Sequence, residues 1–231
     1  MQHLALIMSG NRRWARENKL KAAFLGYDKG VESIKSSISF CLNNNIKYLS
    51  LYTFSLENFR RPEEEKDYLF KLLAIMFKKE LKSLIKEKIN VRFVGDRSKF
   101  PIGIRDVVEK TEERTKDYDR LYLNLLFCYG GQQEIVSAAK KIASKVKNNE
   151  ISLESIDTNT FRQNTWFSDI PEPDLIIRTG SKGELRLSNF LSFQSAYSEF
   201  MFLDEYWPEM NQKLLERCIN NFKGVKRNFG A

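Results

Sequence analysis

Leu4-Ala-Leu-Ile-Met-Ser-Gly-Asn-Arg-Arg-Trp14 is the stretch on which our interpretation of the fold depends. Its apolar first half predicts a buried strand, and the Gly-Asn pair predicts a turn. Arg12, Arg13 and Arg16 follow at the start of a predicted helix. A strand, a glycine turn and arginines at a helix start favour phosphate binding, because free N–H groups, the helix dipole and guanidiniums all attract an anion. The alternative is an ordinary strand-to-helix turn.

The rest of the chain alternates helical and strand patterns. Helices are predicted for residues 28–45, 62–88, 101–116, 132–146, 160–166, 187–194 and 212–224, and further strands for residues 46–54, 91–94, 121–129, 174–177 and 199–203. A basic tail ends the chain. This alternation predicts an α/β fold with a single domain over residues 1–231, in which helices flank a mainly parallel sheet of about six strands.

The predicted helix over residues 62–88 has an apolar stripe that is wider than one core-facing side requires. One explanation is burial on two sides, against the sheet and against a neighbouring helix or subunit. The other is that part of the stripe lines an apolar tunnel for a ligand.

The rare residue types exclude several classes of site. Three cysteines lie far apart in the sequence, which argues against a disulfide framework and a zinc site. His3 is the single histidine, so a Ser-His-Asp triad or a histidine-rich metal site would depend on it alone.

The net charge of +8 is compatible with nucleic acid, an anionic membrane surface or phosphorylated substrates as partners. The lysines and arginines form no long basic block, and no motif supports nucleic-acid binding. No apolar run approaches the roughly 20 residues that span a bilayer, and no charged region precedes the first apolar run as in a signal peptide. We therefore expect a cytoplasmic protein without a transmembrane segment.

Polar motifs follow three of the predicted strands, at residues 9–13, 55–61 and 178–188. The ends of parallel strands meet at one edge of a sheet, where ligands bind. Neither a P-loop nor a G-x-G-x-x-G is present, and no serine or cysteine has a histidine base. Arginines and carboxylates without a nucleophile suit a reaction in which a diphosphate leaves and the protein stabilises its charge.

These motifs resemble those of the cis-prenyltransferase family. The resemblance rests on Met8-Ser-Gly-Asn-Arg-Arg-Trp-Ala15, Tyr52-Thr-Phe-Ser-Leu-Glu-Asn-Phe-Arg-Arg-Pro62, Ile177-Arg-Thr-Gly180, Leu185-Arg-Leu-Ser-Asn-Phe-Leu191, Tyr197-Ser-Glu-Phe200 and Trp207-Pro208. The motifs occur in order over nearly the whole chain. A match of this extent is very specific.

The resemblance implies a role for each matching residue. Asn58 would assist proton removal, and Ser9 stands at the position of the family's catalytic aspartate. The residues implied to bind or line the substrate site are Gly10, Asn11, Arg12, Arg13, Trp14, Tyr27, Ser55, Leu56, Glu57, Phe59, Arg61, Arg178, Arg186, Leu187 and Ser188. Among these, Arg178, Arg186 and Ser188 would hold isopentenyl diphosphate. Glu199 would help to bind the metal.

The resemblance also implies substrates, a cofactor and an assembly. Farnesyl diphosphate would be extended with isopentenyl diphosphate, with Mg²⁺, to a long undecaprenyl diphosphate for cell-wall biogenesis. The protein would be a homodimer, with the C-terminal segment of each subunit near the other's site. The wide helix would wall a tunnel for the growing chain. The product would be delivered to the membrane, with whose inner face the protein can associate loosely.

This chain departs from the family's pattern at several positions. Ser9 replaces an aspartate that binds Mg²⁺, and a neutral hydroxyl is a weak ligand for a hard dication. Tyr27 and Leu185 replace histidines, Phe59 replaces a tryptophan, and Ala23 lies near the position of a phosphate-binding arginine. Ser9 is either a substitution introduced into a normal enzyme or a native residue. The competing hypotheses are therefore a prenyltransferase, impaired by Ser9, and a non-catalytic subunit that binds isoprenoid or a partner.

Overall fold

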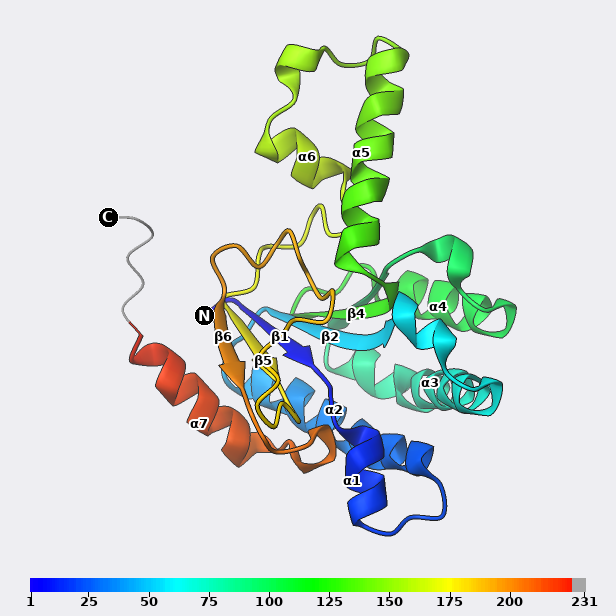
Figure 1. Ribbon diagram of the computed structural model, residues 1–231, viewed down its shortest axis with the longest axis vertical. Coiled ribbons are helices and arrows are strands. Elements are labelled where there is room, and N and C mark those ends of the chain that lie inside the picture. Colours follow the sequence, from blue (N-terminus) through cyan, green and yellow to red (C-terminus); the bar gives the residue numbers. More distant parts are fainter. Residues whose placement is uncertain (226–231) are drawn as a thin grey trace.

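The computed structural model describes residues 1–225, which form one six-stranded sheet with helices around it (Figure 1). The strands are β1 (His3–Ile7), β2 (Tyr48–Ser55), β3 (Ile89–Val94), β4 (Leu121–Tyr129), β5 (Leu175–Arg178) and β6 (Glu199–Phe202). Their order in the sheet is β3-β4-β2-β1-β5-β6, and every neighbouring pair is parallel. The predicted α/β fold is confirmed. The end of the basic tail lies outside the described residues.

Seven α-helices occur within these residues. They are α1 (Asn11–Glu17), α2 (Gly26–Asn43), α3 (Glu63–Lys86), α4 (Ile102–Thr115), α5 (Gly131–Lys147), α6 (Thr158–Asn164) and α7 (Gln212–Lys223). Pro62 and three glutamates begin α3, since a proline fits the non-helical start and acids favour the positive end of the helix dipole. No helix of the described chain is long and apolar enough to cross a membrane.

The helix predicted over residues 187–194 is wrong. This segment consists of turns, and Ser188, Asn189 and Leu191 have positive φ angles of 51°, 65° and 44°. Asn189 instead holds the start of α5: its backbone oxygen accepts from Gly131 N at 2.8 Å, and its Oδ1 accepts from Gln132 N at 2.8 Å. The apolar periodicity arose because this irregular loop buries Leu191 and its neighbour Phe190 in the core.

One face of the sheet forms the larger core. Buried residues from α2, α3, α4 and α7 pack against it; they include Phe40 of α2, Phe77 of α3, Val108 of α4 and Leu215 of α7. On the opposite face, Ile7 and Leu126 pack against irregular segments around Phe167 and Phe190. Helices α5 and α6 pack together and project beyond the sheet (Figure 1). The sheet is therefore shared by two cores of different size.

A polar network lies inside the sheet toward the amino ends of its strands. His3 Nδ1 donates to Pro171 O at 2.6 Å, and Nε2 accepts from Ser50 Oγ at 2.8 Å, with the tautomer assigned from these partners. Ser50 Oγ also accepts from Asn124 Nδ2 at 3.2 Å. Burial lowers the pKa of His3 to about 4, so the ring is neutral at pH 7.

Helix α3 is only partly buried despite its wide apolar stripe. Phe77 and Leu84 are its buried apolar residues, whereas Leu69, Leu73 and Met76 remain partly accessible. Ile75 points outward and is 61% exposed. A helix that covered the sheet without a gap would bury more of this stripe, so the partial accessibility indicates space between α3 and the sheet.

Candidate active site

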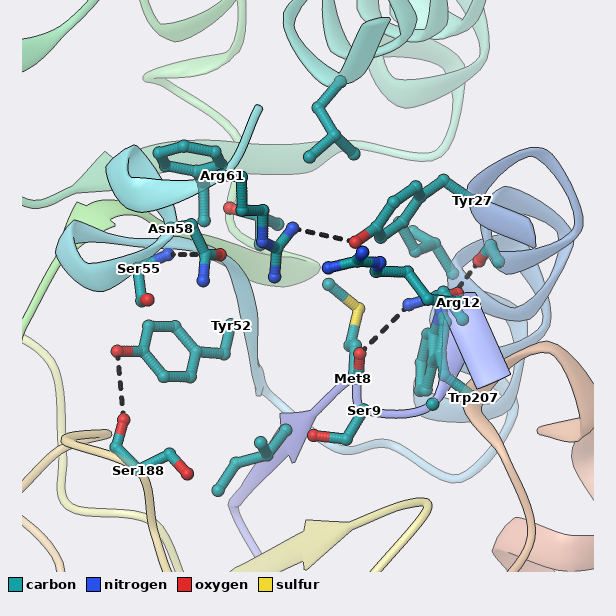
Figure 2. Close-up of a pocket in the computed structure, with 18 of the residues that line it drawn as sticks. Met8, Ser9, Arg12, Tyr27, Tyr52, Ser55, Asn58, Arg61, Ser188 and Trp207 are labelled. Carbon is teal, nitrogen blue, oxygen red and sulfur yellow. Dashed lines mark hydrogen bonds between the residues drawn. The ribbon is translucent and has the colours of Figure 1, made fainter. Parts of the chain in front are cut away.

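A pocket of about 530 Å³ opens at the carboxyl ends of β1, β2 and β5, where the three polar loops converge (Figure 2). Twelve of the predicted site residues line it: Ser9, Gly10, Asn11, Arg12, Arg13, Tyr27, Ser55, Asn58, Arg61, Arg178, Arg186 and Ser188. Six arginines line the pocket, namely the five in this list and Arg16 of α1. One end of the pocket therefore carries a high density of positive charge.

The first loop is shaped by close packing against Tyr206 and Trp207. Gly10 has a φ of 104°, and a Cβ there would lie 2.4 Å from Tyr206 Cδ1, so this position requires glycine. Asn11 is buried and donates through Nδ2 to Met8 O at 3.1 Å. Trp207 N donates to Ser9 O at 2.9 Å. These contacts fix the turn from which the arginines project.

Arg13 ties this loop to the one that follows β5. Its Nη2 donates to Gly180 O at 2.5 Å, and its guanidinium lies 5.3 Å from the centre of the Tyr206 ring. Thr179 Oγ1 donates to Ser9 O at 2.9 Å and completes the connection. The two loops are thereby held as one unit.

Arg178 is the most enclosed of the pocket arginines, with 5% of its surface exposed. Its Nη1 donates to Ser188 Oγ at 2.8 Å and to Arg186 O. Burial, followed by the nearby Arg186 charge, lowers the pKa of Arg178, and Glu184 opposes this only partly. Glu184 lies 3.8 Å from Arg178 Nη2 and 2.7 Å from Arg186 Nη2. An anion bound here would relieve the repulsion between the two guanidiniums.

A second charged cluster lies where α3 meets the first loop. Tyr27 OH donates to Glu65 Oε1 at 3.1 Å and accepts from Arg61 Nη1 at 2.8 Å. Glu65 is 4% exposed and also lies 3.6 Å from Arg12 Nη1. Burial raises the pKa of Tyr27 to about 12, which keeps the hydroxyl protonated. Glu65 and Tyr27 thus hold Arg12 and Arg61 at the pocket wall.

Asn58 faces the pocket from the short turn after β2 (Figure 2). Its Oδ1 accepts from Ser55 N at 3.2 Å, which leaves its amide N–H₂ as the polar group turned toward the cavity. Tyr52 lies beside it, and its hydroxyl donates to Ser188 O at 3.3 Å. This bond connects β2 to the third polar loop.

The other end of the pocket is apolar. It is lined by Val31 and Ile34 of α2, by Phe54 and Phe127 of the sheet, and by Leu69, Phe70, Leu72, Leu73 and Met76 of α3. Of the two explanations for the wide stripe on α3, the lining of an apolar cavity therefore accounts for these residues. A ligand with an anionic head and an apolar tail matches both ends.

Six predicted site residues do not line the pocket. Phe59 packs edge-on against Phe54 with ring centres 5.1 Å apart, and Trp14 is half-buried on α1. Leu56 packs against the larger core and Leu187 against the smaller one. Glu57 is exposed and accepts from Asn189 at 2.7 Å. Glu199 begins β6 and pairs in register with Leu175, at the amino end of β5, whereas Arg178 is at its carboxyl end. Glu199 therefore lies away from the pocket of this chain.

Sequence reasoning missed several residues of the site. Glu65 is one of three acids at the start of α3, and no local pattern distinguishes it from Glu63 and Glu64. Arg16, by contrast, is one of the arginines predicted at the start of the first helix, four positions after Arg12. Tyr52 and Trp207 occur within the resemblance motifs, although their positions in the site require the fold.

The described residues provide few ligands for the Mg²⁺ that the resemblance implies. Glu184 is the one carboxylate among the pocket-lining residues, and two arginines already neutralise it. Residues 1–225 contain no group of three His, Cys, Asp or Glu side chains placed to hold a metal ion. Ser9 offers a neutral oxygen. The side chains of this pocket therefore fit an anion better than a dication.

The chain is similar over its full length to known prenyl diphosphate synthases. The sequence pattern of the family described as "Putative undecaprenyl diphosphate synthase" matches residues 7–230. A ditrans,polycis-undecaprenyl-diphosphate synthase of Micrococcus luteus is 38% identical, over all of this chain and 91% of its own. A geranylgeranyl-diphosphate-specific tritrans,polycis-undecaprenyl-diphosphate synthase of Methanopyrus kandleri is 41% identical, over 99% of this chain and 84% of its own.

Two solved structures of prenyl diphosphate synthases have the same fold as this chain. Lavandulyl diphosphate synthase from Lavandula x intermedia, in complex with dimethylallyl diphosphate, superposes with a TM-score of 0.95 at 31% identity and covers 100% of this chain and 98% of its own. A probable undecaprenyl diphosphate synthase from Campylobacter jejuni superposes with a TM-score of 0.82 at 31% identity, covering 100% and 99%. The fold, the arginine-lined pocket and this similarity together show that the chain is a prenyltransferase of the undecaprenyl diphosphate synthase family.

Proposed function

We propose that this chain condenses isopentenyl diphosphate onto an allylic diphosphate and repeats the step to give a long polyprenyl diphosphate with new double bonds in the cis configuration. The observation that carries this proposal is the two-ended pocket, with six arginines at one end and an apolar wall from α2 and α3 at the other. The charged end suits two diphosphates. The apolar end suits the hydrocarbon chain.

The first step breaks the bond between the allylic carbon and the diphosphate oxygen, and the electron pair leaves with the diphosphate. Negative charge on the leaving group then rises. Arg12, Arg13 and Arg61 would stabilise it from fixed positions, since their bonds to Glu65, Gly180 and Tyr27 orient them before the reaction. Such preorganised donors act without reorganising, which is the source of their effect on rate.

In the second step the double bond of isopentenyl diphosphate attacks the allylic carbon, and a proton leaves to form the new double bond. Arg178, Arg186 and Ser188 would position the isopentenyl diphosphate. No histidine or cysteine lines the described pocket, and Glu184 is held by two arginines. The proposed proton acceptor is therefore a diphosphate oxygen, with the Asn58 amide N–H₂ orienting that group.

The allylic starter is proposed to be farnesyl diphosphate. Relatives of this chain include synthases named as specific for farnesyl diphosphate and for geranylgeranyl diphosphate. The test measures kcat/KM for dimethylallyl, farnesyl and geranylgeranyl diphosphates with labelled isopentenyl diphosphate. A preference for the five-carbon starter would contradict the proposed starter.

The first experiment compares this chain with Ser9→Asp in the incorporation of labelled isopentenyl diphosphate onto farnesyl diphosphate. Mg²⁺ stays a predicted cofactor, and each protein is assayed with Mg²⁺ and with a chelator. Strong elongation by Ser9→Asp with weak elongation by the original chain would assign the defect to Ser9 alone. If neither protein elongates, the proposed activity is wrong.

Ser9 favours one further candidate, a non-catalytic subunit of the same fold. This alternative predicts that isoprenoid diphosphates bind to the pocket while neither serine nor aspartate at position 9 supports elongation. Binding of farnesyl diphosphate is measured beside the incorporation assay. Binding without elongation would support the non-catalytic subunit, whereas absence of both would show that the pocket is not a site for this substrate.

We also propose a homodimer, in which β6 contributes to the interface. β6 is the last strand of the sheet, and Phe200 on it is 41% exposed and stacks with Phe202 at a centre-to-centre distance of 6.5 Å. An exposed aromatic edge strand favours pairing. Light scattering should give twice the monomer mass, and Phe200→Glu should give a monomer, with Val136→Glu as a control on α5, where Val136 is 52% exposed. A monomeric original chain would contradict this proposal.

Consistent with the family, we propose a cytoplasmic site of action and delivery of the product to the membrane.

A further inference from the structure

Asn189 directly follows the third polar loop, residues 178–188, and is hydrogen-bonded to the second, residues 55–61. Its Nδ2 donates to Glu57 Oε1 at 2.7 Å and to Gln133 Oε1 at 2.9 Å. Its Oδ1 accepts from Gln132 N at 2.8 Å, with the orientation of the amide assigned from these partners. Both polar atoms of the Asn189 side chain therefore have partners, and they come from two different parts of the chain.

The backbone of Asn189 is also held in place. Its φ of 65° lies in the left-handed region, which asparagine adopts more readily than most residues, and its carbonyl oxygen accepts from Gly131 N at 2.8 Å. Phe190 and Leu191, which follow it, are fully buried in the smaller core. A Cβ at Gly130 would lie 2.8 Å from Asn189 Nδ2, so the glycine allows this close approach. Asn189 is thus fixed between the start of α5 and the smaller core.

The two loops that Asn189 joins carry groups with different tasks in the proposed reaction. Ser188 and Asn58 both line the pocket (Figure 2). Ser188 precedes Asn189, and its Oγ accepts from Arg178 Nη1 at 2.8 Å in the proposed site for isopentenyl diphosphate. Asn58 follows Glu57 in the short turn after β2. The bond between Asn189 and Glu57 therefore determines how far the isopentenyl diphosphate site lies from Asn58.

This bond is stronger than the connection that β2 makes to the third loop. Its acceptor is a carboxylate and its length is 2.7 Å, whereas Tyr52 OH donates to the neutral Ser188 O at 3.3 Å. Glu57 and Asn189 are 132 positions apart, so their bond joins segments that the local chain does not hold together. Loss of the bond would allow the third loop to move relative to the second.

We propose that Asn189 is a positioning residue for the condensation and that it acts through Glu57 and Ser188. This inference rests on the proposed function, which assigns the third loop to isopentenyl diphosphate. Neither Asn189 nor Glu57 lines the pocket, and both act on the reaction by fixing the distance between the two loops. A misplacement of about 1 Å between reacting groups can lower a rate about 100-fold, so this distance matters for the attack on the allylic carbon.

The test reverses the direction of the hydrogen bond. Asn189→Asp removes the donor and places two carboxylates side by side, while its Oδ1 can still accept from Gln132 N and the Gln133 amide can rotate to donate to it. Combining it with Glu57→Gln restores a bond, because the new amide donates to the new carboxylate. Asn149→Asp is the matched control, since Asn149 also has a positive φ, 58°, and lies exposed just beyond the other end of α5.

Dissociation constants for isopentenyl diphosphate and farnesyl diphosphate are measured by calorimetry with Mg²⁺ present, so the test does not depend on turnover. Asn189→Asp should weaken isopentenyl diphosphate binding about tenfold, since a bond to a charged group is replaced by repulsion. Farnesyl diphosphate binding should change less than about twofold, because other contacts hold its proposed arginines. The double variant should return to within about threefold of the original affinity, and Asn149→Asp should match the original.

Thermal unfolding separates positioning from a general loss of structure. The midpoint of Asn189→Asp should not fall, because a carboxylate at the start of α5 interacts favourably with the positive end of the helix dipole. If this variant does not fold, Glu57→Ala removes the same bond from an exposed position and should give the same loss of isopentenyl diphosphate affinity.

Three results would overturn the inference while the proposed function stands. They are unchanged isopentenyl diphosphate affinity in the variant that breaks the bond, equal losses for both ligands, and a double variant that restores nothing. If the original chain binds farnesyl diphosphate but not isopentenyl diphosphate, the third loop has no such ligand to position and the inference is wrong. If the original chain binds neither ligand, the proposed function fails, and this inference fails with it.

Discussion

The strands of the sheet begin at one side of it, the amino edge, and end at the other, the carboxyl edge. Both edges bury polar side chains, but they differ in how these side chains are paired. At the amino edge, both ring nitrogens of His3 have partners, and Asp174 accepts from the backbone N–H groups of residues 2 and 3 at 2.6 and 3.0 Å. Among residues 1–225, Oδ1 of Asn124 in the amino-edge network lacks a hydrogen-bond partner, but it is a neutral acceptor. At the carboxyl edge the buried atoms without a partner include two charged donors, Nε of Arg12 and of Arg178. Paired polar groups stabilise the fold. Unpaired buried donors indicate a place for a ligand.

The largest effect should come from Arg178→Met, which removes a buried charge at the carboxyl edge and keeps much of the side-chain volume. We expect incorporation of isopentenyl diphosphate to fall about 100-fold, since loss of one preorganised donor to a developing anion costs this much. The thermal midpoint should stay the same or rise, because Arg178 is desolvated and repelled by Arg186. Steady-state kinetics and thermal unfolding measure the two effects.

Arg217→Met is the matched control, because Arg217 is 55% exposed and pairs with Glu205 outside the pocket. Its activity should stay near that of the original chain. Activity within threefold of the original for Arg178→Met would remove the functional distinction between the two edges.

The next effect concerns the amino edge and is a change in stability with pH. His3 has a folded pKa of about 4 against a reference value of 6.5. Between these values the unfolded chain binds more protons, so the free energy of unfolding falls as the pH falls. The contribution of His3 between pH 8 and pH 5 should be about 2 kcal/mol. Urea unfolding at both pH values measures it.

His3→Gln supplies the comparison, because glutamine does not titrate and offers both a donor and an acceptor. The variant should lose about 2 kcal/mol less stability than the original chain between pH 8 and pH 5. Equal losses in the two proteins would show that His3 is not responsible. Its activity at pH 8, relative to folded protein, should be unchanged.

The smallest effect should come from Tyr27→Phe at the carboxyl edge. The change removes the hydroxyl that accepts from Arg61 and donates to Glu65. An unsatisfied partner in a buried site costs about 1 kcal/mol, which corresponds to a rise of about fivefold in KM for the allylic diphosphate. Tyr68→Phe removes a hydroxyl that donates to Asp28 outside the pocket and should leave KM unchanged. Equal KM values for both variants would exclude a positioning role for Tyr27.

The sequence predicted the edge at which the ligand binds but not the network that supports the site. The apolar strand patterns and the polar motifs after them were sufficient to place Arg12, Arg61 and Arg178 together. Glu65 has a local partner in Arg61, four positions earlier and 3.4 Å away, but it also contacts Tyr27 and Arg12, 38 and 53 positions away, and no local pattern contains those contacts. The apolar spacing in residues 187–194 was misleading, because core burial of an irregular loop can imitate one face of a helix.

The central position of β1 has a consequence for how the protein is made. β1 is synthesised early, yet it lies between β2 and β5, and its loop is fastened by Gly180 and Trp207. Arg13 and Gly180 are 167 positions apart. The chain must therefore be synthesised as far as Trp207, and this residue must have left the ribosome, before the arginines reach their final places. Nascent chains that end before β5 have no partner for one edge of β1, and truncated translation products of this kind cannot bind substrate as the complete site does.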